Sequence, residues 1–162
     1  IDEFIKPLLA GHHIGLISEA GNPCIADPGA LVTTLAHELK ITIRPLVGPS
    51  SILLALIASG FNGQYFTFHG YLPIDKQERI KKIKQMEQRI YHEEQTQIFM
   101  ETPFRNNQLL ADLLAQCHNT TKLCIACNIT APEEKIVTQT IVQWKNTKIN
   151  LHKLPTVFLL FK

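Results

Sequence analysis

The sequence lacks any long uninterrupted run of apolar residues, which argues against a helix that crosses a membrane. Its first residues also lack the basic segment, apolar stretch and cleavage pattern of a secretory signal. The sequence also lacks a large excess of charge of one sign, since its formal net charge is only +2. This charge neither demonstrates nor excludes a nucleic-acid partner. With 45% apolar and 19% charged residues, the composition is typical of a globular protein, and we expect a cytoplasmic location.

Cysteine is also sparse, and none of the four cysteines completes a metal motif. Cys124 and Cys127 have the C-x-x-C spacing of metal and redox sites, but no second such pair or histidine pair accompanies them. They lie in an apolar run predicted as a strand, where residues three apart point to opposite faces. We therefore expect free thiols at these positions and at Cys24 and Cys117, and no metal site.

The stretch from His13 to Ser51 contains two short apolar runs, residues 14–17 and 41–47, on either side of a helical pattern. A crossover of helix length predicts that the two runs form parallel strands of one βαβ unit. In such sheets, ligands bind beyond the carboxyl ends of the strands. Each run is followed there by a loop rich in glycine and proline, so we expect the chemistry at this edge.

The loop residues support this interpretation. Gly21 permits a positive φ, and Asp27 followed by Pro28 is typical of a helix N-cap and first turn. Ser50 or Ser51 is expected to cap a further helix, residues 52–59. Taken one at a time, these loops are also explained as tight turns of an α/β scaffold.

The remaining sequence predicts a second α/β domain after a boundary near Gly63. Helix 1–9 precedes the βαβ unit, so the first domain covers residues 1–63 and the second residues 64–162. The second domain is expected to hold a mixed sheet with strands 65–69, 96–100, 122–128, 136–143 and 156–161, and helices 76–94 and 106–116.

Helix 76–94 carries six basic side chains, which could follow a phosphate backbone. Four glutamates interleave with them, as they do in an ordinary solvated surface helix, so both interpretations stay open. The basic residues are Lys76, Arg79, Lys81, Lys82, Lys84 and Arg89.

Four segments together resemble the tetrapyrrole-methylase-type (class III) S-adenosylmethionine methyltransferases. That family carries an S-D-A-G-T-P…D-P-G loop, a P-G-P-S loop, a G-F-L-P segment and an E-S-P-H-R segment in this order. The counterparts here are residues 18–23 with 27–29, 48–50, 70–73 and 101–105. The similarity is greatest to the branch that methylates ribose 2′-hydroxyls of small-subunit ribosomal RNA. The family's opening T-P-I-G-N-type strand and E-D-T-R segment are absent here, so we expect a fragment or a form without that portion.

The resemblance implies an α/β fold of the tetrapyrrole methylase type, with an incomplete parallel first domain and a mixed-sheet second domain. It implies S-adenosylmethionine as cofactor, RNA of the small ribosomal subunit as partner, and a homodimer. The implied cofactor-binding residues are Ala20, Gly21, Asn22, Ile25, Ser50, Ser51, Met100, Asn128 and Ile129. The implied substrate-binding residues are Glu19, Lys76, Arg79 and Arg105, with Glu101 and Lys76 as catalytic candidates.

A ribose hydroxyl needs a base to become a good nucleophile, which is why Glu101 is a candidate. Its alternative role is a structural carboxylate before Thr102 and Pro103. The sequence departs from the family at Phe104, which replaces histidine, and at Asn128-Ile129-Thr130-Ala131, which replaces E-L-T-K. Asn22 and Glu19 replace threonine and aspartate. A small-molecule acceptor such as a tetrapyrrole, and a non-catalytic cofactor- or RNA-binding relative, remain as alternatives.

Overall fold

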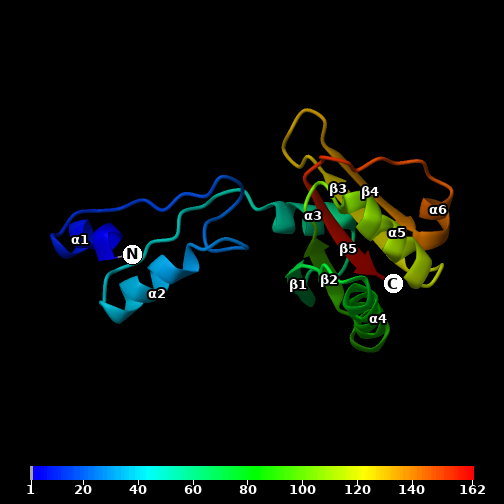
Figure 1. Ribbon diagram of the computed structural model, residues 1–162, viewed down its shortest axis with the longest axis horizontal. Coiled ribbons are helices and arrows are strands. Elements are labelled where there is room, and N and C mark those ends of the chain that lie inside the picture. The colour runs from blue at the N-terminus through cyan, green and yellow to red at the C-terminus, as the bar shows by residue number, and fades with distance from the viewer. Residues whose placement is uncertain (1) are drawn as a thin grey trace. The chain divides into compact units, whose positions relative to one another are not determined.

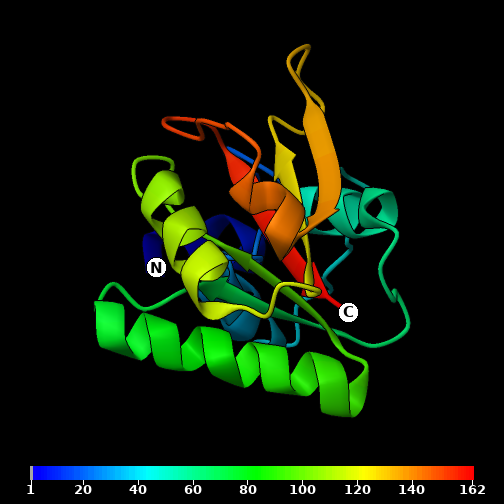
Figure 2. The same ribbon diagram turned by 90° about the vertical axis from the view of Figure 1, so that its right-hand side faces the viewer.

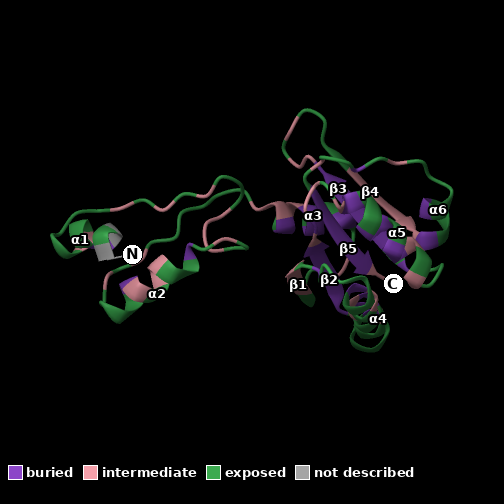
Figure 3. Cartoon of the chain, in the orientation of Figure 1, coloured by how far each residue is buried: buried purple, intermediate pink, exposed green. Residues whose placement is uncertain are grey.

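The computed structural model describes residues 2–162 and divides into two compact units, Ile1–Ser50 and Ser51–Lys162 (Figure 1). Among the described residues, no helix is long and apolar enough to span a membrane. The core lies in the second unit, whereas most of the first unit is exposed or half-buried (Figure 3). The two units therefore differ in how much of their apolar surface they bury.

The first unit consists of helices α1 (Asp2–Leu9) and α2 (Ala30–Glu38), joined and followed by extended chain. Both helices were expected, but the two strands predicted at residues 14–17 and 41–47 are not formed, and this prediction was wrong. A strand needs a neighbour that bonds its backbone. Ile17 and Leu46 are each 89% exposed, so these apolar runs have no covering layer within this unit.

The second unit contains the expected mixed sheet, with strand order β1-β2-β5-β3-β4. The pair β1 and β2 is parallel, and the pairs β2 with β5, β5 with β3, and β3 with β4 are antiparallel. The strands are β1 (Phe66–Tyr71), β2 (Thr96–Met100), β3 (Lys122–Cys127), β4 (Lys135–Thr140) and β5 (Thr156–Phe161).

Helices cover both faces of this sheet (Figure 2). One face packs against α4 (Lys76–Glu93), α5 (Asn106–Gln116) and α6 (Ile141–Lys145), and the other against α3 (Ser51–Ser59). Helix α6 lies partly in the range that we predicted as strand 136–143. The strand ends at Thr140 because its side chain and that of Gln143 form a reciprocal capping box that starts the helix.

Strand β3 shows the alternation expected of a strand covered on both sides. Cys127 belongs to the cluster under α4 and α5, whereas Cys124 belongs to the cluster under α3. All four cysteines are free, as expected, and burial raises the pKa of Cys124 and Cys127. Burial, together with the charge of Glu87, raises the pKa of Cys117 to about 12, so this thiol is unreactive at neutral pH.

Helix α3 belongs to the second unit by its contacts, although the sequence placed it before the domain boundary at Gly63. Its buried residues Ile52, Ala55 and Leu56 pack against the face of the sheet that carries Cys124. Gly60, at φ +76°, ends the helix in the left-handed conformation. The helix is thereby tied to the sheet rather than to the extended chain that precedes it.

A buried ion pair joins α4 to α5. The Arg79 Nη2 and the Asp112 Oδ2 lie 2.7 Å apart, and Arg79 Nε donates to the same oxygen over 2.8 Å. Arg79 Nη1 also donates to the carbonyl of Ile74 over 2.7 Å. Arg79 is only 2% exposed, so its charge is compensated inside the protein and not by solvent.

Replacing Arg79 with methionine should lower the free energy of unfolding by about 3–5 kcal/mol, because it leaves the Asp112 carboxylate buried and unpaired. Urea denaturation measures this loss. The double variant R79M/D112L should recover most of it, and Lys84→Met, on an exposed position of the same helix, should have little effect. A loss below about 1 kcal/mol for R79M would contradict this account of the pair.

Candidate functional site

The carboxyl ends of two strands meet at one edge of the sheet. Met100 at the end of β2 and Ala126 near the end of β3 both pair with Val157, at the start of β5. Because β5 runs antiparallel to both neighbours, β2 and β3 both end beside the first residues of β5, one on each side. The Asn128 N–H then donates to the Pro155 carbonyl over 3.0 Å, which fixes the turn after β3 to this edge.

The turn after β3 holds its backbone in a conformation that side chains disfavour. Asn128 and Thr130 have φ values of +49° and +71°, on either side of Ile129. The Thr130 N–H donates to the Glu134 Oε2 over 2.7 Å, which helps to hold this geometry. Such strain is concentrated at binding and catalytic sites, where it sets the direction of particular groups.

This edge combines two apolar side chains, which form its apolar wall, with one polar side chain. Met100 and Ile129 are half-buried against the cluster under α3. The side-chain amide of Asn128 has no hydrogen bond to another residue in the part of the chain that the structure describes. This arrangement matches a small-molecule pocket, which needs apolar surface and a few polar groups to orient the ligand.

Glu101 follows β2 at the same edge and is only 4% exposed. Its Oε1 accepts the N–H of Thr102 over 2.6 Å and lies 2.5 Å from Arg105 Nη2. The carboxylate therefore fixes both the start of the following turn and the Arg105 guanidinium. Arg105 itself keeps 27% of its side chain exposed, so it can still contact a ligand.

Two other candidate residues, both on α4, differ in whether a ligand can reach them. Lys76, in the first turn of α4, is exposed. Arg79, one turn later, is buried in its pair with Asp112 and serves the scaffold. Phe104, at the position of the family's histidine, is 68% exposed and has its ring centroid 5.9 Å from that of His152.

In the first unit, Asp27 organises the loop before α2. Its Oδ1 accepts the N–H of Cys24 over 2.6 Å and that of Gly29 over 2.8 Å. The bonds from Gly29 and then Cys24 hold the pKa of the Asp27 carboxyl below its ordinary value. The expected role of Asp27 as N-cap of α2 was wrong: Gly29 is the N-cap, and the Asp27 carboxylate is bonded within the preceding turn.

The two glycine-containing loops of the first unit meet, although the strands expected before them are absent. A Cβ atom added to Gly48 would lie 2.9 Å from the Asn22 Oδ1, so the side chain of Asn22 rests against the Gly48 backbone. The loop also uses left-handed conformations at Gly21, Cys24 and Ala26. Glycine at position 48 is thus what allows this close approach.

The other residues implied in these loops are at or near the surface. Glu19, Ala20 and Gly21 are exposed, and Ile25 is 50% exposed. Ser50 ends the first unit and Ser51 begins α3. Sequence reasoning missed the strained Thr130, because a positive φ at threonine leaves no mark in the sequence. Among the described residues, no group of three or more histidine, cysteine, aspartate or glutamate residues could hold a metal ion.

Comparison with known proteins decides the family. The sequence model of one protein family, the tetrapyrrole (corrin/porphyrin) methylases, matches residues 1–144. This chain belongs to that family. Relatives called "Ribosomal RNA small subunit methyltransferase I" are 36% identical over 112 residues in Xylella fastidiosa and 32% identical over 159 residues in Pasteurella multocida. The alignments cover 69% and 96% of this chain but 40% and 55% of those relatives, so the chain spans about half their length.

Solved structures confirm the fold of this tetrapyrrole methylase family member. The methyltransferase CobJ matches with a TM-score of 0.66 at 16% identity, over 99% of this chain and 69% of that one. Uroporphyrin-III C-methyl transferase from Thermus thermophilus, in complex with S-adenyl homocysteine, matches with a TM-score of 0.56 at 13% identity. That alignment covers 99% of this chain and 73% of the other. At these identities the likeness concerns the fold alone.

The turn around Asp27 should open in acid. Because folding lowers the pKa of this carboxyl below 3.8, the stabilisation is complete at higher pH and is lost as the pH falls through the lowered value. The amide resonances of Cys24 and Gly29, followed by NMR during an acid titration, should shift together below pH 3.8. In the variant D27N these amides should not titrate. A common midpoint above 3.8 would contradict the assignment.

Proposed function

We propose that this chain is part of a methyltransferase that uses S-adenosylmethionine to methylate RNA, at a ribose 2′-hydroxyl of the small ribosomal subunit. The observation that carries the proposal is the edge where β2 and β3 end, with its apolar wall, its strained turn and the buried Glu101. Membership of the tetrapyrrole methylase family and the names of the relatives support it. A homodimer in the cytoplasm is part of the same proposal.

The residues present fit the cofactor's chemistry. Half-buried Met100 and Ile129 offer apolar surface, and Asn128 offers an amide without a partner among the described residues. S-adenosylmethionine would supply a methyl group on a sulfonium, an already reactive leaving group, so the protein's main task is alignment. In the first unit, we propose that the Asn22 side chain and the backbone of the loop around Gly21 contact the cofactor. Ala20, Ile25, Ser50 and Ser51 complete the proposed set.

For the RNA, we propose that Lys76 and Arg105 contact phosphate groups and that Glu19 contributes to acceptor binding. Arg79 is left out, because its guanidinium is held in the scaffold by Asp112. For Glu101 we propose a positioning role: its carboxylate orients Arg105 rather than taking the hydroxyl proton. The bidentate geometry of arginine suits a phosphate, which explains why a fixed orientation would matter.

Calorimetric titration of S-adenosylhomocysteine into the protein tests the cofactor site. We expect measurable binding that is lost in Asn22→Trp and Met100→Trp, because the larger side chains fill the proposed contacts. Gln108→Trp, on an exposed position of α5, is the matched control and should bind normally. Absence of binding to the folded protein, or equal binding by all three variants, would overturn the cofactor assignment.

Transfer of a radioactive methyl group to small ribosomal subunits tests the role of Glu101. If Glu101 acts through Arg105, then Glu101→Gln and Arg105→Met should each raise KM for the subunits by about tenfold with kcat nearly unchanged. The double variant should be no worse than either single one. A fall in kcat of about a hundredfold or more at constant KM in E101Q alone would instead identify Glu101 as the general base.

A further inference from the structure

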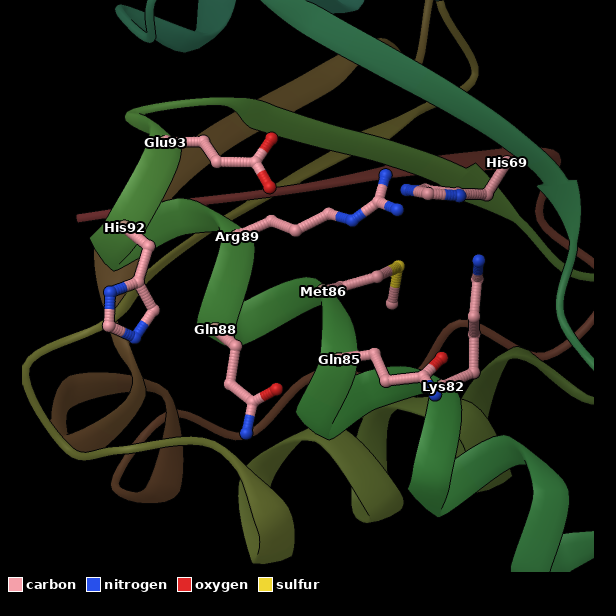
Figure 4. A pocket seen from close by; sticks show the side chains of 8 residues that line it. All are labelled: His69, Lys82, Gln85, Met86, Gln88, Arg89, His92 and Glu93. Atoms are coloured by element: carbon pink, nitrogen blue, oxygen red, sulfur yellow. The ribbon is translucent and has the colours of Figure 1, made fainter.

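A pocket lies between the edge strand β1 and helix α4, and it includes none of the residues named at the carboxyl edge. It has a volume of about 410 Å³ and is lined by His69, Lys82, Gln85, Met86, Gln88, Arg89, His92 and Glu93. In Figure 4 the ends of the Lys82 and Arg89 side chains point toward the His69 ring. Its residues all belong to the second unit.

A bulge in β1 places His69 in this pocket. The register of β1 on β2 shifts between Phe68 and Tyr71, so that His69 and Gly70 lie opposite Phe99 alone. Gly70 takes up the irregularity with a φ of +66°, a conformation that suits glycine. Bulges are common beside functional sites because they change the direction of a side chain.

A chain of glutamine amides fixes the tautomer of His69. The Gln97 Nε2 donates to the Gln95 carbonyl and to the Gln95 Oε1, both over 2.9 Å. The Gln97 Oε1 is therefore the acceptor that lies 2.7 Å from His69 Nε2, which must carry the proton. Burial, opposed by the Gln97 bond and aided by the charges of Lys82 and Arg89, lowers the pKa of His69. The ring is accordingly neutral at pH 7, with a lone pair on Nδ1.

The pocket has more positive than negative charge. Lys82 and Arg89 have neither a salt bridge nor a hydrogen bond with another residue in the part of the chain that the structure describes. Glu93 is the one carboxylate in the lining, and it accepts the hydroxyl of Tyr65 over 3.1 Å. Two unpaired cations beside a fixed donor-acceptor ring are an arrangement that suits an anion with several oxygens.

We propose that this pocket binds a phosphate group through Lys82, Arg89 and His69. The cations compensate the charge of the phosphate, and the imidazole contributes a further hydrogen bond from Nδ1 once the bound anion favours its protonation. The phosphate can belong to an RNA backbone or be a free phosphate ion, and both present anionic phosphate oxygens. The pocket shares no residue with the proposed cofactor site, so this proposal can be tested independently of methyl transfer.

The experiment follows the His69 ring by ¹H–¹³C NMR during pH titrations of the full chain, with sodium phosphate, a single-stranded RNA oligonucleotide, or sodium chloride at matched ionic strength. Phosphate or RNA should raise the pKa of His69, because a bound anion stabilises the imidazolium, whereas chloride should not. His118, which is outside the lining of the pocket, serves as the internal reference. A response to phosphate alone identifies a free phosphate ligand, and a response to RNA at concentrations where phosphate has no effect identifies a backbone.

The paired variants K82Q/R89Q and K81Q/K84Q distinguish a specific phosphate site from general electrostatic attraction to the helix. Each removes two cations from α4, but only the first pair lines the pocket. We expect K82Q/R89Q to weaken the phosphate affinity, measured from the shift of the His69 pKa, about tenfold or more, and K81Q/K84Q to leave it nearly unchanged. Equal weakening by both pairs, or no shift of His69 with either phosphate or RNA, would overturn the proposal. S-adenosylhomocysteine binding should be the same in both variants, which distinguishes this test from that of the cofactor site.

Discussion

The insertion of β5 between β2 and β3, antiparallel to both, determines where the candidate site can form. A strand that starts at an edge where two neighbours end brings two loops to the same place without any contact between the loops themselves. Met100 and Ala126 both pair with Val157, so β2 and β3 end at the same level of the sheet. Burial of Phe158 and Leu160 on one face and of Val157 and Leu159 on the other holds the strand in register.

The strained turn after β3 depends on the same strand. The Asn128 N–H is bound to the carbonyl of Pro155, just before β5 begins, so the position of β5 fixes the first residue of the turn. Left-handed conformations at Asn128 and Thr130 would relax in a free loop. They persist here because the sheet anchors one end of the turn, and Glu134 holds the Thr130 amide. The family's E-L-T-K segment has lost two charged residues here, yet this backbone-defined geometry does not need them.

Sequence periodicity predicted most of the second unit well, because its central strands β2, β3 and β5 are buried and each of its helices has buried residues. The ranges 96–100, 106–116 and 156–161 agree with β2, α5 and β5 residue for residue. The same signals failed in the first unit, where the apolar run that includes Leu46 and Val47 is extended but unpaired. An apolar run indicates what a segment can pair with, whereas pairing itself needs a neighbouring strand that the described residues of this unit do not supply.

The candidate site shows a similar division between what residue types indicate and what only contacts reveal. The motif order located the loops around Gly21, Gly48 and Glu101, but not that Asp27 is bound within its own turn or that Arg79 is buried. The six basic residues on α4 cannot be told apart in the sequence. Helical spacing predicts which face carries a charge, but not which residues of other elements lie beside it. Asp112, more than thirty positions away, makes Arg79 part of the core. Lys82 and Arg89 instead face the bulge of β1 without such a partner among the described residues, and a carboxylate at the right place on β1 would have made them structural too.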